Sequence, residues 1–231
     1  MKKTLQEVRE YINEGVYDPG IFKAFFLAGG PGSGKTFVTA SAFAGTGLKL
    51  VNSDIKFERD LRKANLSLKM PDEEAYFRDI IRKGSKEFVG KQLDTYLKGR
   101  LGVIIDATGR DFSLIQRQSQ MLKLLGYDCY MIFVNTSLDV ALERNRTRSR
   151  SIPEYIVQKS WKGVQANLGA FQKVFGHSKM LIVDNNRDEK ELVTQTLNTA
   201  SRFIRSRLRT KPENRTAMAW IKRELELKKR K

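Results

Sequence analysis

Eight consecutive residues, Gly29 to Thr36, constrain this chain more than any other feature, because they read Gly-Gly-Pro-Gly-Ser-Gly-Lys-Thr. They match the phosphate-binding loop pattern G-x-x-x-x-G-K-[ST], in which glycines let consecutive backbone N–H groups point into one concavity. The apolar run 21–28 predicts a buried strand before the loop, and residues 37–44 predict a helix after it. The sequence therefore predicts a nucleoside triphosphate site, and a glycine turn that fits the pattern by chance is the alternative.

The polar residues at the end of this loop have separate roles in the pattern. We expect Lys35 to reach the β- and γ-phosphates and the Thr36 hydroxyl to hold Mg²⁺. Asn185, which follows the last expected strand, is a further expected nucleotide contact. The full set of expected nucleotide contacts is Gly30, Pro31, Gly32, Ser33, Gly34, Lys35, Thr36 and Asn185.

Length and cysteine content narrow the class of protein. A chain of 231 residues suits one α/β domain with attachments and can bury a real core. Its single cysteine, Cys129, lies in the apolar run 127–134, so no disulfide forms within the chain and a reducing cytoplasm, in a bacterial or phage-infected cell, is expected. Polar residues at 4–14 argue against a signal peptide, and no apolar stretch approaches the roughly 20 residues that span a bilayer.

Positive charge is the second informative property. Forty-three Lys and Arg against 26 Asp and Glu give a formal net charge of +17. Residues 201–231 hold 12 of the basic and 3 of the acidic residues, a net of +9, which leaves 31 − 23 = +8 on the rest of the chain. Such a field favours a polyanionic partner, with nucleic acid, and DNA in particular, the leading candidate. A solubilising surface or a tail that docks on an acidic protein are the alternatives.

Strand and helix patterns alternate along the chain, which favours a parallel, doubly wound α/β sheet. Five apolar runs read as strands, at 21–28, 48–51, 101–106, 127–134 and 180–183. Helices are expected at 37–44, 55–65, 71–98, 112–125, 137–146, 153–174 and 190–207, with Gly84 and Gly90 as possible breaks in the third. We divide the chain into an N-terminal amphipathic helix (1–20), a kinase-like domain (21–210) and a basic helical tail (211–231), since Pro212 interrupts the preceding helix.

Ligands of such sheets bind beyond the carboxyl ends of the strands, so the residues there are the candidate site. Asn52 and Asp54 follow the second strand, and a carboxylate beside the phosphate loop can accept the proton of an attacking hydroxyl. The alternative is that Asp54 only caps the next helix. Asp106 ends the third strand, like the Walker B carboxylate that supports Mg²⁺, and Thr108 and Arg110 after it are candidate substrate contacts. A turn and helix cap is again the alternative.

An arginine-rich segment at about 144–153 predicts a lid. Arg144 and Arg148 are four residues apart and share one helix face, so both can point at a triphosphate. Alternating arginines at a helix end can also be a solvated last turn that the helix dipole favours. With a phosphate loop upstream, we interpret the segment as a lid.

These motifs, in this order, resemble the zeta toxin and polynucleotide kinase group of small P-loop kinases, over residues 22–186. The resemblance implies that Asp54 is the base that activates the acceptor hydroxyl and that Arg144 and Arg148 act on the ATP phosphates. Residues 106–110, Asp-Ala-Thr-Gly-Arg, are more like the zeta branch, although that branch usually has Glu at the place of Asp106. The polynucleotide kinases have a Ser-Asp-Thr-Asn run there, while the lid spacing is like theirs.

The sequence thus predicts an ATP-dependent, Mg²⁺-requiring kinase with Asp54 as base and with Lys35, Arg144 and Arg148 stabilising the phosphoryl group. The net charge favours an acceptor hydroxyl on nucleic acid, either a 5′ end or a hydroxymethyl group on a modified pyrimidine in DNA. One alternative is a zeta-type kinase that acts on sugar nucleotides such as UDP-sugars. The other is a nucleic-acid-binding ATPase without kinase activity.

Overall fold

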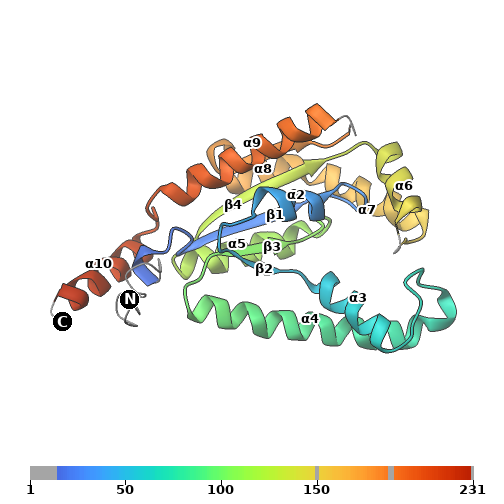
Figure 1. The fold of residues 1–231 in the computed structure, drawn as a ribbon, viewed down its shortest axis with the longest axis horizontal. Coiled ribbons are helices and arrows are strands. Elements are labelled where there is room, and N and C mark those ends of the chain that lie inside the picture. The colour runs from blue at the N-terminus through green and yellow to red at the C-terminus, as the bar shows by residue number, and fades with distance from the viewer. Residues whose placement is uncertain (1–14, 149–150, 187–189, 230–231) are drawn as a thin grey trace, which may run out of the picture.

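The sheet is built around β1 (Lys23–Ala28), whose six residues are all buried. The structure is a computed structural model that describes residues 15–148, 151–186 and 190–229. Four more strands run parallel to it: β2 (Lys49–Val51), β3 (Val103–Asp106), β4 (Asp128–Asn135) and β5 (Met180–Asp184). Their order, β2-β3-β1-β4-β5, confirms the doubly wound parallel sheet, with all carboxyl ends at one edge (Figure 1).

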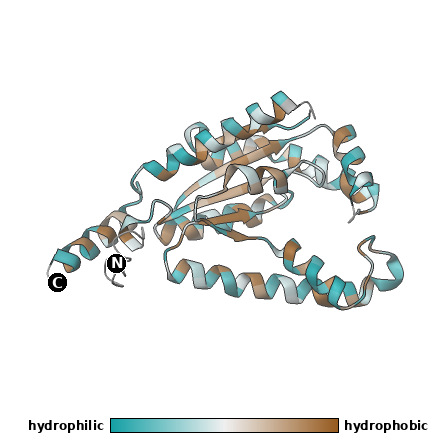
Figure 2. Cartoon of the chain, in the orientation of Figure 1, coloured by the Kyte–Doolittle hydropathy of each residue, from teal (hydrophilic) through white to brown (hydrophobic). Residues whose placement is uncertain are grey.

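Alternate residues of β1 belong to two separate cores, one on each face of the sheet, as the period of two along a strand requires. Phe26 lies in the larger core with residues of α4 (Ala75–Lys98), α5 (Phe112–Leu124), α8 (Leu168–Phe175) and α10 (Arg215–Lys229). Phe25 and Leu27 lie in the smaller core with residues of α2 (Lys35–Ala42) and α9 (Lys190–Arg209). The strands are accordingly the most hydrophobic part of the ribbon, and the helices outside them are mixed (Figure 2). Burial on both faces explains why the strands read as continuous apolar runs.

The helices follow the predicted alternation closely. They are α2 (Lys35–Ala42), α3 (Ser53–Lys63), α4 (Ala75–Lys98) after the short 3₁₀ turn η2 (Asp72–Glu74), α5 (Phe112–Leu124), α6 (Leu138–Thr147), α7 (Glu154–Ala166), α8 (Leu168–Phe175) and α9 (Lys190–Arg209). Gly84 and Gly90 do not break α4, because Ser85, Val89 and Leu93 hold one side of the helix against the protein. The Ser137 side chain caps α6, as expected.

The single helix predicted at 153–174 is wrong, since α7 and α8 are separate. The break falls at Asn167, whose side-chain amide donates to the carbonyls of Gly109 (3.0 Å) and Arg110 (2.9 Å). A side chain 57 and 58 residues away from its partners in sequence therefore sets the bend between the two helices.

Helix α10 (Arg215–Lys229) follows the interruption around Pro212 and packs on the body of the protein. Ala217 is fully buried, and the Trp220 ring lies edge-on to Phe22 with 5.6 Å between centroids. The guanidinium of Arg100 lies over the other side of that indole, at 4.4 Å. The basic tail is thus in direct contact with the core near the amino ends of the strands, where Figure 1 shows α10.

The predicted N-terminal helix lies mostly outside the described residues, which begin with the 3₁₀ turn η1 (Gly15–Tyr17). Within the described ranges, no helix is long and apolar enough to cross a membrane. Cys129 is a buried free thiol in β4, and burial raises its pKa to about 12.

Candidate active site

The phosphate loop joins the carboxyl end of β1 to the first turn of α2, whose N-cap is Gly34. Gly32 and Gly34 have φ of +78° and +86°, a conformation that side chains disfavour. A Cβ at Gly32 would lie 2.3 Å from the carbonyl oxygen of Ala141, and one at Gly34 would lie 2.2 Å from Nδ2 of Asn185. Both glycines are therefore required by the backbone conformation and by neighbours from other elements.

The ends of β4 and β5 fix the shape of the loop. The Ser33 carbonyl accepts hydrogen bonds from Asn185 Nδ2 (2.7 Å) and from the Thr136 hydroxyl (3.2 Å). The backbone carbonyl of Asn185 in turn accepts from Arg144 Nη1 at 2.8 Å. Asn185 is buried, so the predicted nucleotide contact lies against the loop and connects it to α6.

Trp161 of α7 closes the other side of the loop, and the sequence reasoning missed it. Its indole Nε1 donates to the Thr136 carbonyl at 2.6 Å. A Cβ at Gly30 would lie 3.5 Å from the Trp161 Cα, so the helix packs directly on the loop. In the sequence, Trp161 is a single large apolar residue within a predicted helix. It therefore looks like an ordinary core residue, and nothing in the sequence marks it as a neighbour of the loop.

The loop has the features of a triphosphate cradle. Lys35 Nζ donates to the Gly29 carbonyl at 2.6 Å, within the loop itself. The Ser33 hydroxyl is buried without a hydrogen-bond partner among the described residues, a group that an anionic oxygen could satisfy. Thr36 is exposed in the first turn of α2, where the helix dipole and free N–H groups favour negative charge.

Asp54 lies in the first turn of α3, but it does not cap that helix. The N-cap is Asn52, whose side-chain oxygen accepts from the Asp54 backbone N–H at 2.7 Å. The Asp54 carboxylate instead receives Arg82 Nη1 of α4 at 2.5 Å. Arg82 also lies over the Phe57 ring at 4.7 Å, and sequence reasoning missed it because the pair is 28 residues apart.

Asp106 lies beside this pair, at the end of β3. The Asn52 side-chain amide donates to its Oδ2 at 2.6 Å, so Asn52 links the Asp106 carboxylate to the backbone N–H of Asp54. Burial raises the pKa of Asp106, and the negative charge of Asp54 adds to that rise, while Lys35 and the Asn52 hydrogen bond oppose it. A cation bound beside Asp106 would therefore stabilise the charged form of its carboxylate, which burial disfavours.

Lys35 shows that the candidate residues form one site. Burial lowers the pKa of its ammonium group, the carboxylates of Asp106 and Asp54 oppose this, and the positive charge of Arg148 adds to it. The structure thus brings together residues from the phosphate loop, β3, α3 and the predicted lid. They come from four separate segments of the sequence.

Oxygen donors suited to Mg²⁺ are present, namely the Thr36 hydroxyl, the Asp106 carboxylate and the neighbouring Asn52 amide. No group of three or more His, Cys, Asp or Glu residues in the described ranges could hold a metal ion by itself. This set fits Mg²⁺, which uses one or two protein oxygens together with phosphate oxygens and water. The raised pKa of Asp106 agrees with a carboxylate placed to meet a cation.

The predicted lid consists of the end of α6 and the loop after it, which hydrogen bonds hold together. The buried Asn145 side chain donates to the Ile152 carbonyl (2.7 Å) and accepts from the Ile152 N–H (3.1 Å), which holds the segment in a loop. The exposed Arg146 side chain forms an ion pair with Glu154 Oε1 at 2.5 Å. Arg148 ends α6 and is exposed, while residues 149–150 of the predicted lid lie outside the described ranges.

The turn after β3 is held in place by neighbours on both sides. The Thr108 carbonyl accepts from the Gly29 N–H at 3.0 Å, so this turn contacts the phosphate loop, and the Thr108 residue is exposed. The stem of Arg110 lies against Gly163 of α7, where a Cβ would meet its Cγ at 2.9 Å. Thr108 is therefore beside the loop, and Arg110 is tied to α7.

Solved structures share the fold at low identity. A proposed kinase from Chloroflexus aurantiacus has a TM-score of 0.53 at 18% identity, over 81% of this chain and 98% of that chain. A shikimate kinase from Acinetobacter baumannii, solved with shikimate, has 0.51 at 16% identity over 83% and 98%. The AvrRxo1-ORF1:AvrRxo1-ORF2 complex with ATP has 0.53 at 12% identity over 85% and 79%.

These similarities show a P-loop kinase-like fold. No curated protein matches the sequence. A family model does match, over residues 25–171, more than half of the chain and the part that carries the phosphate loop, Asp54, Asp106 and the lid. On that match the chain belongs to the family described as AAA domain, AAA_33.

Proposed function

We propose that this protein is an ATP-dependent kinase that transfers the γ-phosphoryl group to a hydroxyl on nucleic acid. The observation that supports a kinase is the position of two carboxylates beside the phosphate loop: Asp106 is in register with Leu27 of β1, and Asn52 links the Asp106 carboxylate to the backbone of Asp54. An ATPase needs only water at the γ-phosphate, whereas this site places an oriented carboxylate on a separate arm, α3 with α4, that can meet an acceptor.

In the proposed mechanism, Asp54 takes the proton of the acceptor hydroxyl. The acceptor oxygen then forms a bond to the γ-phosphorus while the bond from that phosphorus to the β,γ-bridging oxygen breaks, which yields the phosphorylated acceptor and ADP. Arg82 orients the Asp54 carboxylate through their ion pair, so its role is positioning. Asn52 holds Asp54 and Asp106 in fixed relation, because it bonds to both.

Positive groups around the phosphates supply the remaining stabilisation. Lys35 exchanges its bond with the Gly29 carbonyl for phosphate oxygens, and Arg144 and Arg148 approach from the lid. Thr36 and Asp106 would hold Mg²⁺, which when bound neutralises charge on the phosphate oxygens. Asn185 keeps the lid in register with the loop, since its side chain bonds the loop and its carbonyl accepts from Arg144.

Net charge supports a nucleic-acid acceptor. A formal charge of +17 on 231 residues exceeds what a small, singly charged metabolite requires, and it suits a polyanion. The acceptor hydroxyl would be a 5′ end or a hydroxymethyl group on a modified pyrimidine. Both are alcohols that the same base can activate.

A sugar-nucleotide kinase of the zeta type is the second candidate. It is favoured by residues 106–110, Asp-Ala-Thr-Gly-Arg, which resemble that branch. Asn167 fixes the turn by bonding the carbonyls of Gly109 and Arg110, and Thr108 is exposed beside the loop. A UDP-sugar would bring its own phosphates to the same positive site.

The test presents γ-labelled ATP to a panel of acceptors, with Lys35→Ala as the inactive control. The panel contains 5′-hydroxyl DNA and RNA, DNA with hydroxymethylated pyrimidines, free nucleosides, UDP-sugars and shikimate. Label on a polynucleotide and not on UDP-sugars supports the proposal. Label on UDP-sugars and not on a polynucleotide refutes nucleic acid as the acceptor. Release of labelled phosphate with no labelled acceptor would show an ATPase. Digestion of a labelled polynucleotide to nucleotides separates 5′ ends from bases.

A further inference from the structure

We propose that the exposed basic faces of α9 and α10 form a fixed surface for the phosphate backbone of nucleic acid. The inference rests on the proposed function for the nature of the polymer, and it concerns residues outside the active site. The surface, here called the basic ridge, consists of Arg202, Arg205, Arg209, Arg215, Lys222 and Lys229.

Helical spacing places these residues on one face of each helix. Arg202, Arg205 and Arg209 are related by three and seven residues, and Arg215, Lys222 and Lys229 by seven and fourteen. All six residues are exposed, and none forms an ion pair or side-chain hydrogen bond with another described residue. On α10 only Glu226 adds a negative charge to the same face.

The α10 charges therefore lie about 10 Å apart along the helix, and those of α9 about 5–6 Å apart, at a rise of roughly 1.5 Å per residue. Figure 1 shows α9 and α10 one after the other along one side of the molecule. Arg202 to Arg209 spans about 10 Å and Arg215 to Lys229 about 21 Å. Both stretches can face several phosphates of a duplex, whose two strands carry a negative charge every ~1.7 Å of axis.

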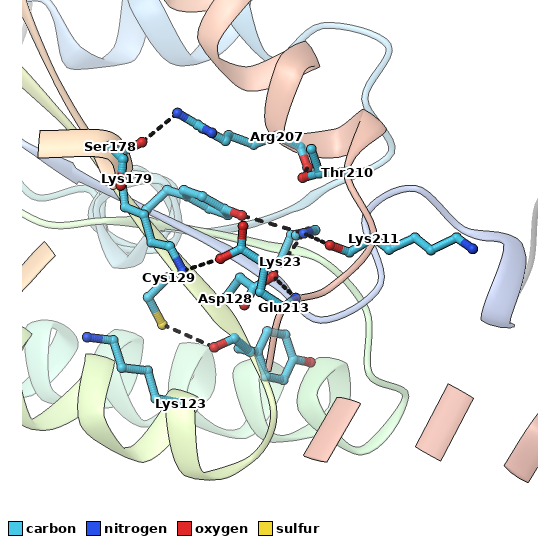
Figure 3. Close-up of polar contacts among 12 residues, drawn as sticks. Lys23, Lys123, Asp128, Cys129, Ser178, Lys179, Arg207, Thr210, Lys211 and Glu213 are labelled. Atoms are coloured by element: carbon cyan, nitrogen blue, oxygen red, sulfur yellow. Dashed lines mark hydrogen bonds and ion pairs between the residues drawn. The ribbon is translucent and has the colours of Figure 1, made fainter. Parts of the chain in front are cut away.

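The orientation of α10 is fixed by buried charges, which makes its basic face a preformed surface. Lys23 Nζ and Asp128 Oδ2 form an ion pair at 2.9 Å, with side chains 0% and 3% exposed. The same Asp128 oxygen accepts from the Glu213 backbone N–H at 2.9 Å, and Glu213 Oε2 pairs with Lys179 at 2.8 Å. Figure 3 shows these groups converging on the segment between α9 and α10.

Arg207 illustrates the contrast between the two faces of α9. Its Nη2 donates to the Ser178 carbonyl at 2.5 Å (Figure 3). Its guanidinium also lies over the Phe203 ring, at 5.1 Å. Arg207 thus ties α9 to the body, while Arg202, Arg205 and Arg209 point away from it. The sequence charge count includes both kinds of arginine, and only the structure separates them.

Packing of α10 argues for nucleic acid and against a membrane surface. An amphipathic helix enters a bilayer through its apolar face, but Ala217, Trp220 and Ile221 already lie against the core. The side left to solvent carries the basic residues of the helix, with Met218 and Leu227 as its exposed large apolar side chains. A stiff polyanion suits charges repeated along about 30 Å better than a compact acidic ligand does.

The test measures binding of a 20-base-pair duplex with 5′-hydroxyl ends by fluorescence anisotropy, in the absence of ATP and at several salt concentrations. Arg205→Gln with Arg209→Gln removes two ridge charges on α9. Arg117→Gln with Lys173→Gln removes two exposed charges outside the ridge, from α5 and α8 on the face of the sheet opposite to α9. We expect the ridge variant to lose about tenfold or more in affinity at low salt. We also expect its slope of log K against log salt to fall by about 1.8, at 0.9 per phosphate contact. The control should bind nearly as the unchanged protein does.

A second pair of variants tests the fixed orientation of α10. Arg215→Gln with Lys222→Gln removes charge from its face, and Trp220→Ala removes the packing against Phe22 and Arg100 while keeping the charge. Both should weaken duplex binding, and unchanged affinity in Trp220→Ala would overturn the fixed orientation. Equal effects in the Arg205/Arg209 variant and the Arg117/Lys173 control would overturn the ridge. Binding to phosphatidylserine vesicles in preference to duplex, lost in the ridge variant, would also overturn it.

Failure of this inference is distinguishable from failure of the proposed function. Loss of duplex binding in the ridge variants without any labelled polynucleotide would retain the ridge and remove the nucleic-acid acceptor. Labelled polynucleotide together with unchanged duplex binding in the ridge variants would retain the nucleic-acid acceptor and overturn the ridge. An RNA duplex of the same sequence tells whether the ridge distinguishes DNA from RNA.

Discussion

Replacing Asp54 with Asn separates a catalytic role from a structural one, because the structure bounds the structural effect. The Asp54 and Arg82 side chains are 43% and 34% exposed, so their ion pair contributes about 0–1 kcal/mol to stability. The cap of α3 comes from Asn52, so the variant leaves it in place. We therefore expect the melting temperature to change by no more than about 2–4 °C.

Loss of a general base should cost far more in catalysis. Such losses are typically 10²–10⁴-fold in turnover, about 2.7–5.4 kcal/mol of activation free energy at 1.36 kcal/mol per factor of ten. We expect Asp54→Asn to lower kcat in this range while the affinity for ATP, measured by calorimetry, changes little. The assay is transfer of labelled phosphate at saturating acceptor.

Arg82→Gln is the matched control, because it breaks the same ion pair and leaves the carboxylate in place. If Asp54 is the base, Asp54→Asn should reduce kcat at least tenfold more than Arg82→Gln does at similar melting temperatures. Equal, small effects on turnover in the two variants would refute the reasoning. Asp54 would then be a structural partner of α4, and the acceptor would be activated elsewhere.

Three further outcomes test the site and the fold. Asn185→Ala removes the hydrogen bond to the Ser33 carbonyl, so ATP binding should weaken about 2- to 10-fold, as for loss of a neutral hydrogen bond. Unchanged affinity in calorimetry would contradict a role of Asn185 in holding the phosphate loop. Gly84→Ala fills open space on α4 and should raise stability by about 0.5–1 kcal/mol in thermal denaturation, whereas a decrease would show strain in that helix. The Cys129 thiol, with its pKa raised to about 12, should react with a thiol reagent only after unfolding. Because that folded-state pKa lies above the ordinary value of 9.0, stability should fall as pH rises above 9.0, and less so in Cys129→Ala.

Elements with strong local signals could be predicted from the sequence. Every residue of β4 except the last is buried, so its apolar run identified it as a strand of a parallel sheet. The phosphate loop was identifiable because its chemistry requires a fixed spacing of glycine, lysine and threonine. Gly84 and Gly90 were misleading as breaks, since a helix held on one side by the core tolerates glycine on the exposed side.

Features that depend on distant residues could not be predicted. The break at Asn167 depends on carbonyls of the turn after β3, and the partner of Asp54 lies in the middle of α4. The docking of α10 depends on Asp128, which is 85 residues away from Glu213. Composition gave the charge of the tail, but the contact between Trp220 and Phe22 that orients it has no local sequence signal.

The parallel sheet also explains how two positively charged surfaces can act independently. Lys23, at the start of β1, belongs to the buried charges that hold α10, and Gly29, after the end of β1, belongs to the phosphate loop. Six residues of strand separate them by roughly 20 Å, and every residue of that strand is buried on both faces. Because a packed strand deforms little, changes that loosen α10 should alter affinity for nucleic acid without altering affinity for ATP. The amino ends of the strands thus position α10, the helix that we propose binds the polymer, and the carboxyl ends position the loop that we propose binds the phosphates.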